Sequence, residues 1–168
     1  MMGDRIKIGK NVFFGEGTVL GAKPLNLEFV PGKNYRRRTK FCGEIVIEDD
    51  VNIGSNCVIV GGVDEPTRIK RHAWINHGSQ IGHGVEIGKR TVLGNGVIVL
   101  GKAIIGSDCY IAAGSIIKPL VKIGDRTMIG MGSVVTRNIP SGVIAYGNPC
   151  HIIRVNEWHP PQTSNTKP

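Results

Sequence analysis

An aliphatic residue recurs at every sixth position along most of this chain. From residue 69 onward the series has no break and comprises Ile69, Ile75, Ile81, Ile87, Leu93, Val99, Ile105, Ile111, Ile117, Ile123, Ile129 and Val135. A period of six fits neither an amphipathic helix, whose apolar positions recur at three and four, nor a plain strand of period two. The pattern predicts a short strand and a tight turn in every six-residue unit.

A small or β-branched residue follows each aliphatic four positions later: Ala73, Ser79, Val85, Thr91, Val97, Ala103, Cys109, Ser115, Val121, Thr127 and Ser133. Three units of six (3 × 6 = 18 residues) return the chain to the same side one layer higher, so that aliphatics stack on aliphatics. Successive layers then pair as parallel strands. We predict an all-β parallel helix with three hexapeptides per coil, in which Cys57 and Cys109 are inert inward thiols.

Two segments interrupt the period, which is otherwise present in two earlier runs, Ile8, Phe14, Leu20 and Phe41, Ile47, Ile53, Ile59. Residues 22–40 contain prolines and a basic run, and residues 60–68 contain Asp64, Glu65 and Pro66. Both are predicted to be loops inserted at a corner of the coil, where long insertions cost little and functional residues often lie.

The length of 168 residues fits one domain. We predict a β-helical domain over residues 1–155, closed by residues 143–155. Residues 156–168 are rich in proline and polar side chains, and this composition predicts a disordered tail.

Composition narrows the possible functions. Aromatic residues are only 5% of the chain, 24 residues are glycine, and the net charge is +8, which would suit a polyanionic or phosphorylated partner. The sparse aromatics are not interleaved with the cations, which argues against nucleic-acid binding. Four separated cysteines without a CxxC pair or a secretory leader predict a reduced, cytoplasmic protein, and no apolar run reaches the roughly 18 residues of a membrane span.

The hexapeptide pattern from Ile8 to Arg154 resembles the left-handed β-helix acyltransferases. That resemblance implies a left-handed coil, a homotrimer with active sites in the grooves between subunits, and acyl transfer from CoA or acyl carrier protein. The handedness comes from the resemblance alone, because crossovers between parallel strands are right-handed in most proteins.

The segment from Ile75 to His83, INHGSQIGH, resembles the catalytic coil of bacterial sugar O- and N-acetyltransferases of the sialic acid O-acetyltransferase type. It also resembles the Gln-Ile-x-His coil of the lipid A acyltransferases. The match implies that His83 is the general base and that the N–H of Gly101, one coil later, contacts the oxyanion and the acyl-CoA. Asn76 is implied to position the acceptor or the base, and His77 is implied to contact the acceptor.

The residue types suit this chemistry. A neutral imidazole can take the proton of an attacking amine or hydroxyl, and a fixed N–H that stabilises the oxyanion contributes about 3–4 kcal/mol. The implied reaction moves an acetyl group from acetyl-CoA, without a metal, to an amine or hydroxyl of a nucleotide-linked sugar for surface polysaccharide synthesis. Lys118, Arg137 and Arg154 are implied contacts for the CoA phosphates, because relatives bind the nucleotide end there.

Several alternatives stay open at this point. Many relatives have an acidic or amide residue after the base, but Gly84 follows His83, so the group that orients the imidazole is unassigned. His72 and His77 are five residues apart, like two zinc ligands of the γ-class carbonic anhydrases, which share this fold. A non-catalytic β-helical scaffold is a further alternative. The run Arg36–Arg38 is read as a solvated basic loop or as a contact to a nucleotide-sugar phosphate in a neighbouring groove.

Overall fold

A computed structural model describes residues 5–22, 27–29, 36–38 and 43–157 of the chain, with only the backbone described at 27–29 and 36–38. These residues form 22 strands and no helix. None of them therefore provides a helix that could cross a membrane.

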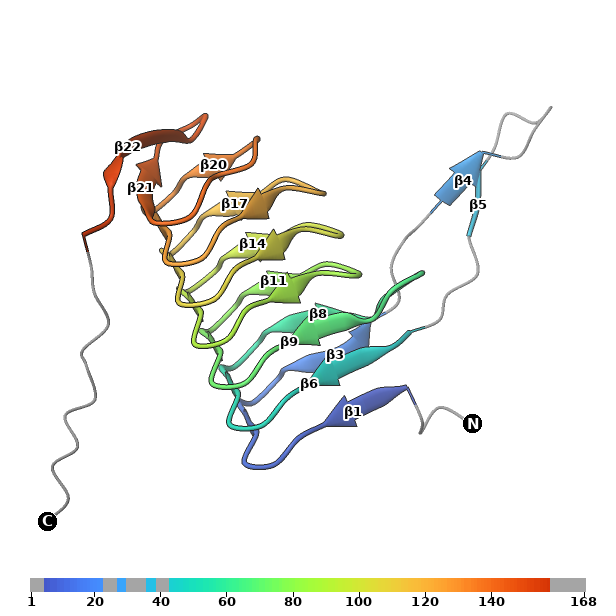
Figure 1. The fold of residues 1–168 in the computed structure, drawn as a ribbon. Helices are drawn as coiled ribbons and strands as arrows, with labels where there is room; N and C mark the ends of the chain where they lie inside the picture. The colour runs from blue at the N-terminus through green and yellow to red at the C-terminus, as the bar shows by residue number, and fades with distance from the viewer. Residues whose placement is uncertain (1–4, 23–26, 30–35, 39–42, 158–168) are drawn as a thin grey trace, which may run out of the picture.

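Three parallel sheets form the sides of a triangular prism that rises coil by coil (Figure 1). Sheet A contains β1 (Ile6–Ile8), β6 (Ile45–Ile47), β9 (Thr67–Ile69), β12 (Glu86–Ile87), β15 (Ile104–Ile105) and β18 (Lys122–Ile123). Sheet B contains β2 (Phe13–Phe14), β7 (Asn52–Ile53), β10 (Trp74–Ile75), β13 (Val92–Leu93), β16 (Tyr110–Ile111) and β19 (Met128–Ile129), followed by β21 (Val143–Tyr146) and β22 (His151–Val155). Sheet C contains β3 (Val19–Ala22), β8 (Val58–Val60), β11 (Gln80–Ile81), β14 (Ile98–Val99), β17 (Ile116–Ile117) and β20 (Val134–Val135).

The core is the predicted aliphatic stack. All twelve aliphatics from Ile69 to Val135 are at most 2% exposed, and the small positions that follow them are buried with them. Strands 18 residues apart pair in register, so Ile87 lies beside Ile105, and Ile105 lies beside Ile123. Each layer is thus buried by the next, as expected of a solenoid.

The first coil departs from the prediction. The six-residue period predicts Ile8 in the stack with Phe14 and Leu20, but Ile8 is 49% exposed, and the other two are only partly buried against the core. The reason is that no described coil lies beneath the first one to cover its inward side chains. Burial becomes complete from Ile45 in the second coil upward.

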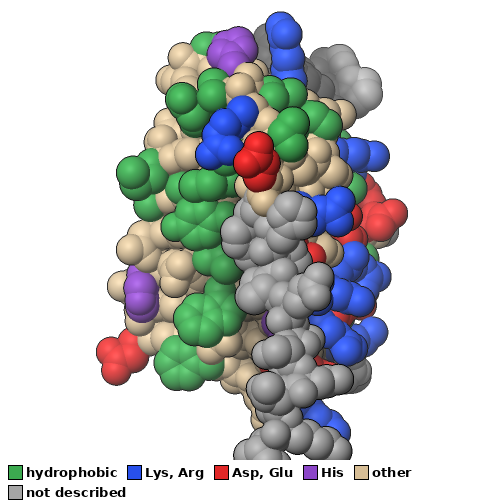
Figure 2. Space-filling view, turned by 60° about the vertical axis from the view of Figure 1, so that its left-hand side comes forward, with side chains coloured by type: hydrophobic (Ala, Val, Ile, Leu, Met, Phe, Trp, Pro, Cys, Tyr) green, Lys and Arg blue, Asp and Glu red, His purple; other side chains and the backbone are tan. Residues whose placement is uncertain are grey.

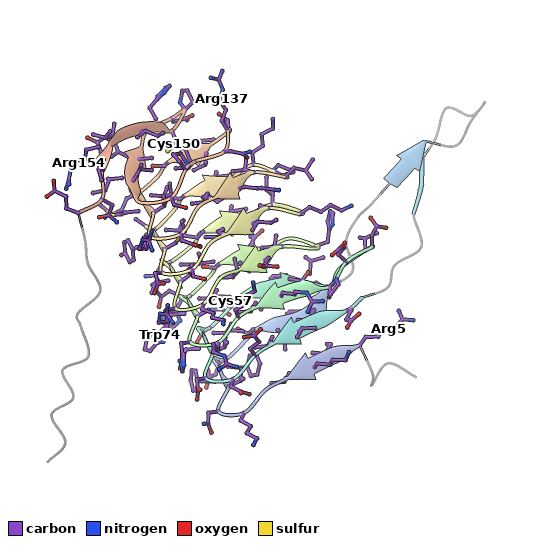
Figure 3. The ribbon with its side chains drawn as sticks, viewed as in Figure 1. Arg5, Cys57, Trp74, Arg137, Cys150 and Arg154 are labelled. Carbon is purple, nitrogen blue, oxygen red and sulfur yellow. The ribbon has the colours of Figure 1, made fainter. Side chains whose placement is uncertain are left out.

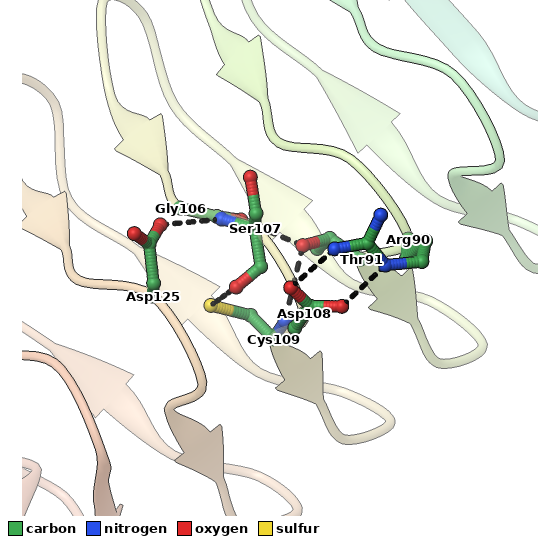
Figure 4. A network of polar contacts seen from close by, with 7 residues as sticks. All are labelled: Arg90, Thr91, Gly106, Ser107, Asp108, Cys109 and Asp125. Carbon is green, nitrogen blue, oxygen red and sulfur yellow. Dashed lines mark hydrogen bonds and ion pairs between the residues drawn. The ribbon is translucent and has the colours of Figure 1, made fainter. Parts of the chain in front are cut away.

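Turns at each corner are held by side chains from the neighbouring coil. At the corner between sheets A and B, the Ser107 N–H donates to Asp125 Oδ1 at 2.7 Å, and Arg90 pairs with Asp108 at 2.6 Å (Figure 4). Cys109 lies inside this turn, where burial raises the pKa of its thiol to about 11. The prediction that Cys57 and Cys109 point inward is confirmed, since their exposures are 0% and 2%.

Both predicted insertions leave the prism at the corner where sheet C leads into sheet A, here named the C–A corner. The first connects β3 to β6 and includes an antiparallel pair, β4 (Leu27–Phe29) and β5 (Arg36–Arg38), which projects from the prism (Figure 1). The basic run is therefore a strand of a two-stranded ribbon and not a plain loop. The second insertion spans residues 61–66, because β8 continues to Val60 and β9 begins at Thr67.

The C-terminal end of the helix is closed by β21 and β22. These strands continue sheet B as an antiparallel pair after β19 and lie within residues 143–155, for which a closing segment is predicted. The tail predicted beyond it lies outside the described residues, except for Asn156 and Glu157.

Candidate active site

His83 lies at the C–A corner, in the turn 82–85 that joins β11 to β12. Its position in the coil repeats one layer higher at Gly101, in the turn 100–103 between β14 and β15. The backbone N–H of Lys102 donates to the His83 carbonyl at 2.8 Å, which fixes the two turns to one another. His83 and Gly101 are therefore neighbours along the axis of the prism, as the 18-residue period predicts.

The His83 imidazole lies directly against the backbone of Gly101. A Cβ placed on Gly101 would be 2.5 Å from Nε2 and 2.8 Å from Cε1 of the ring. The imidazole thus takes the space of a missing side chain, and only glycine permits this packing. In the described ranges the Gly101 N–H donates no hydrogen bond, so it is available to a ligand beside the ring.

The environment of His83 favours the neutral imidazole. The ring is half-buried, and burial lowers its pKa below the usual 6.5, with a further lowering from the Lys102 ammonium and an opposing effect from the Asp64 carboxylate. Nδ1 is buried and has no hydrogen-bond partner among the described residues. Nε2 is the ring nitrogen that lies beside Gly101.

The loop 61–66 packs beside the His83 turn. Asp64 Oδ2 accepts a hydrogen bond from Lys102 Nζ at 2.7 Å, across 38 residues of sequence. The Thr67 hydroxyl accepts from the Gly84 N–H at 2.9 Å and donates to the Val60 carbonyl at 2.8 Å. Sequence analysis did not identify Asp64 or Lys102 as part of the site, because only the three-dimensional path of the loop brings them to it.

Asn76 and His77 do not join His83 within one chain. They lie in the turn 76–79 between β10 and β11, at the corner where sheet B leads into sheet C. The Asn76 side chain donates to the Leu93 carbonyl at 2.9 Å, and His77 Nδ1 accepts from the Ser55 N–H at 2.9 Å. Both residues border a groove of about 340 Å³ that also contacts Phe13 and Trp74 on sheet B.

Two of the three predicted CoA contacts share the corner of His83. Lys118 and Arg137 are exposed on the C–A corner, two and three coils above His83. With a coil spacing of about 4.8 Å, this places them about 10–15 Å higher along the axis. Arg154 lies on β22, beside Ile144 of β21, on another side of the prism from Arg137 (Figure 3).

No pattern in the sequence predicts a second groove, which the structure contains. It has a volume of about 610 Å³, lies over sheet A in the upper coils, and is lined by Lys70, Glu86, Ile104 and Lys122 together with turn residues of the corner between sheets A and B. Most of its turn residues lie at the edge of sheet A opposite the C–A corner. Lys122 gives it a cation that the hexapeptide pattern alone could not distinguish from any solvated lysine.

The histidines considered as zinc ligands are held apart. His72 lies in the turn before β10 and His77 in the turn after it, and His72 Nδ1 is 3.8 Å from Asp50 Oδ2. No group of three potential metal ligands is found among the residues that the structure describes. Within one chain, His72 and His77 belong to different corners, on either side of β10.

Known proteins share the hexapeptide repeat of this chain. The model of the bacterial transferase hexapeptide repeat matches residues 66–101 and 102–137, and that of the hexapeptide repeat of succinyl-transferase matches residues 44–64. The UDP-3-O-acylglucosamine N-acyltransferase of Delftia acidovorans is 34% identical over 128 residues, which are 76% of this chain and 38% of that protein. The same enzyme of Hahella chejuensis is 34% identical over 65% of this chain and 31% of its own length. The chain thus spans about a third of these relatives.

Solved structures give the fold its class. LpxA from Acinetobacter baumannii superimposes with a TM-score of 0.73, at 22% identity, over 90% of this chain and 64% of that one. PerB from Caulobacter crescentus, solved with CoA and GDP-perosamine, gives a TM-score of 0.61 at 28% identity, over 65% of this chain and 51% of that one. The protein is a left-handed parallel β-helix, as predicted. It belongs to the bacterial hexapeptide-repeat transferase family.

Proposed function

We propose that this protein transfers an acetyl group from acetyl-CoA to an amine or hydroxyl of a nucleotide-linked sugar, in the synthesis of a surface polysaccharide. The observation that carries the proposal is the His83 imidazole lying against the backbone of Gly101, whose N–H is available to a ligand. The class of substrates is supported by PerB, which was solved with CoA and a nucleotide sugar, and by the N-acyltransferases of acylglucosamine among the relatives. Acetyl-CoA as donor assigns the reaction to the cytoplasm.

The proposed reaction needs no covalent enzyme intermediate. His83 Nε2 takes the proton of the acceptor amine or hydroxyl while the acceptor attacks the thioester carbonyl carbon. The carbonyl oxygen becomes an oxyanion, which the Gly101 N–H stabilises. The C–S bond then breaks, the imidazolium returns its proton to the leaving thiolate, and CoA and the acetylated sugar are released.

The lowered pKa of His83 fits the first step. A base must be neutral before it can accept a proton, and partial burial keeps this ring neutral at the pH of the cytoplasm. The absence of a side chain at Gly101 leaves room for the ring and for the thioester beside the same N–H. Base and oxyanion donor are thereby supplied by two successive coils of one corner.

The donor is proposed to extend upward from His83 along the C–A corner. Lys118 and Arg137 stand about 10–15 Å above the base, a span comparable to the pantetheine arm of CoA, and can meet its phosphates. The groove over sheet A offers Lys122 as a further cation. Arg154 lies on another side of the prism and is proposed to reach a donor held by a neighbouring subunit.

A homotrimer is proposed from an apolar column on the outer surface of sheet B. The column consists of Phe13, Trp74, Val92, Tyr110 and Met128, of which Phe13, Trp74 and Tyr110 are 60%, 52% and 46% exposed. From Trp74 upward its members are paired on successive strands, and Asn52 lies between Phe13 and Trp74. Figure 2 shows hydrophobic side chains stacked along this face. A surface of this kind favours contact with another protein chain.

The trimer also gives Asn76 and His77 a role. A ring with threefold symmetry uses two different surfaces of each subunit, so the C–A corner of one chain can meet the sheet B side of the next. The groove formed by Phe13, Trp74, Asn76 and His77 would then face His83 of the neighbour. The acceptor is proposed to bind between these two surfaces.

The first test is thermal unfolding with and without acetyl-CoA, followed by release of free thiol with a panel of amino and hydroxy nucleotide sugars. Stabilisation by acetyl-CoA and thiol release with one sugar are the expected results. No stabilisation at millimolar acetyl-CoA would reject this donor and direct the test to acyl carrier protein. If neither donor binds, metal analysis separates a zinc protein from a scaffold.

A further inference from the structure

We infer that Asp64 and Lys102 form a positioning pair for His83, in which the carboxylate of the 61–66 loop and the ammonium of the coil above together set the charge of the base. This inference rests on the proposed function, because it concerns the same histidine. It fills the role that the sequence left unassigned, since Gly84 follows His83 where many relatives have an acidic or amide side chain.

Three contacts enclose the His83 turn between the loop and the next coil. The Lys102 N–H binds the His83 carbonyl at 2.8 Å, and the Lys102 ammonium binds Asp64 at 2.7 Å. On the other side of the turn, the Gly84 N–H is bound by Thr67, the first residue after the loop. The base is thus fixed through its own backbone, while the two charges are held beside it.

Gly84 has a positive φ of 64°, a conformation that side chains disfavour. A Cβ on Gly84 would lie 3.3 Å from Lys102 Cγ and 3.7 Å from the Glu65 carbonyl oxygen, so the Lys102 stem and the loop backbone both lie close to this position. The backbone conformation thus favours glycine at position 84, and the acidic group comes from the loop instead.

The two charges act on the imidazole in opposite directions. Lys102 lowers the pKa of His83 and Asp64 raises it, and these are the charged groups that act on the ring among the described residues. Glu65 acts on the Lys102 ammonium. Lys102 therefore favours the neutral base before the reaction, and Asp64 favours the imidazolium that forms when the acceptor loses its proton.

The reaction also requires one tautomer of the ring. When Nε2 accepts the proton of the substrate beside Gly101, Nδ1 must already carry one, and no described residue bonds to it. Asp64 is the carboxylate whose charge acts on this ring. Its negative charge stabilises the imidazolium that forms when Nε2 accepts the second proton.

The experiment compares Asp64→Asn with Lys102→Met in the full-length protein. The titration of each histidine is followed by NMR without substrate, and the His83 signal is identified by its loss in His83→Asn. In Asp64→Asn the unpaired ammonium should shift the His83 pKa downward. In Lys102→Met the unpaired carboxylate should shift it upward, and the double variant should return most of the way to the parent value.

A matched control is the Arg90–Asp108 pair, which joins two turns 18 residues apart at the corner between sheets A and B. Asp108→Asn removes a comparable ion pair and should leave the His83 titration unchanged. If the Asp64 and Lys102 variants shift the pKa in the same direction, or shift it no more than Asp108→Asn does, the inference is wrong.

Activity then separates this inference from the proposed function. In an active enzyme, the acid limb of kcat/KM should move to lower pH in Asp64→Asn and to higher pH in Lys102→Met. KM for the donor should change less than kcat. If the two variants shift the His83 pKa in opposite directions but the parent protein transfers no acyl group, the positioning pair is supported and the acyltransferase function is rejected. If the parent protein transfers acyl groups but neither variant moves the acid limb, the acyltransferase function is supported and the positioning pair is rejected.

Discussion

Thr67 and Gly84 are joined by a hydrogen bond in which the backbone N–H of Gly84 donates to the Thr67 hydroxyl at 2.9 Å. The same hydroxyl donates to the Val60 carbonyl, so one fully buried side chain connects both ends of the 61–66 loop with the turn of His83. The position of the 61–66 loop is therefore coupled to that of the His83 turn.

Thr67→Val should disturb this coupling with little change in volume. It leaves the Val60 carbonyl and the Gly84 N–H without partners, and we expect a loss of about 1–3 kcal/mol of unfolding free energy. Acyl transfer should fall further than stability explains. The control is Thr91→Val, since Thr91 makes a similar pair of backbone hydrogen bonds at another corner. Equal activity in the two variants would contradict the link between the loop and the base.

His83→Ala should reduce kcat/KM for acyl transfer by about 100-fold or more, because general-base help is typically worth that much. Circular dichroism and the melting temperature should change little, since the ring lies in an outer turn. His72→Asn provides the control, because His72 is exposed at another corner and has a positive φ of 59° that asparagine tolerates. Activity above about a tenth of the parent value in His83→Ala would remove His83 from the role of base.

Gly101→Ala tests the contact between the His83 imidazole and the Gly101 backbone separately from the fold. The added Cβ would meet Nε2 and Cε1 of His83. The ring can rotate away, so we expect nearly parental stability, but the displaced base should reduce acyl transfer by about 100-fold. Gly88→Ala is the contrasting variant, because its Cβ would meet the backbone of Gly106. That variant should lose stability. An active Gly101→Ala enzyme would show that the ring does not need its place beside this backbone.

The pH dependence follows from the sign of the His83 shift. Burial and Lys102 lower the pKa, so the neutral base persists to a lower pH than it would for a free histidine. We expect kcat/KM to rise with pH through a midpoint below 6.5 and to be flat through neutrality. A limb with its midpoint above 6.5 would mean that another group controls the activity or that the acceptor itself titrates.

Trp74→Glu tests the proposed trimer. A carboxylate in the apolar column of sheet B should reduce the mass measured by light scattering from that of a trimer to that of a monomer, and acyl transfer should fall with it. Val19→Glu is the control, since Val19 is similarly exposed at 49% but lies on sheet C. A monomeric parent protein at micromolar concentration would reject both the trimer and a site shared between subunits.

The sequence predicted the repeating parts of this structure more fully than its irregular parts. A six-residue period is a local property, and it located the buried stack from Ile69 to Val135 and the vertical neighbours His83 and Gly101. The contact between Asp64 and Lys102 depends on the path of a loop without a period, so no spacing pointed to it. The ribbon that contains Arg36–Arg38 was likewise hidden, because its pairing is antiparallel and lies outside the coil.

The roles proposed for Asn76, His77 and Arg154 stay predictions for a related reason. In a single chain these residues lie away from the His83 corner, at the corner between sheets B and C and on β22. A hexapeptide repeat specifies the interior of one prism, but it contains no information on which outer surfaces meet. Only surface features such as the exposed Trp74 and Tyr110 bear on that question.

In the stacked coils, distances along the axis of the prism change in equal steps of one coil. Each coil adds about 4.8 Å along the axis and buries the same kind of core, so the separation between His83 and a residue above it changes only in whole steps. Inserting one 18-residue coil after the Gly101 turn would raise Lys118 and Arg137 by one step and leave the imidazole on its glycine. The length of donor that such an enzyme accommodates can thus be lengthened or shortened by gain or loss of a repeat, without redesign of the chemistry.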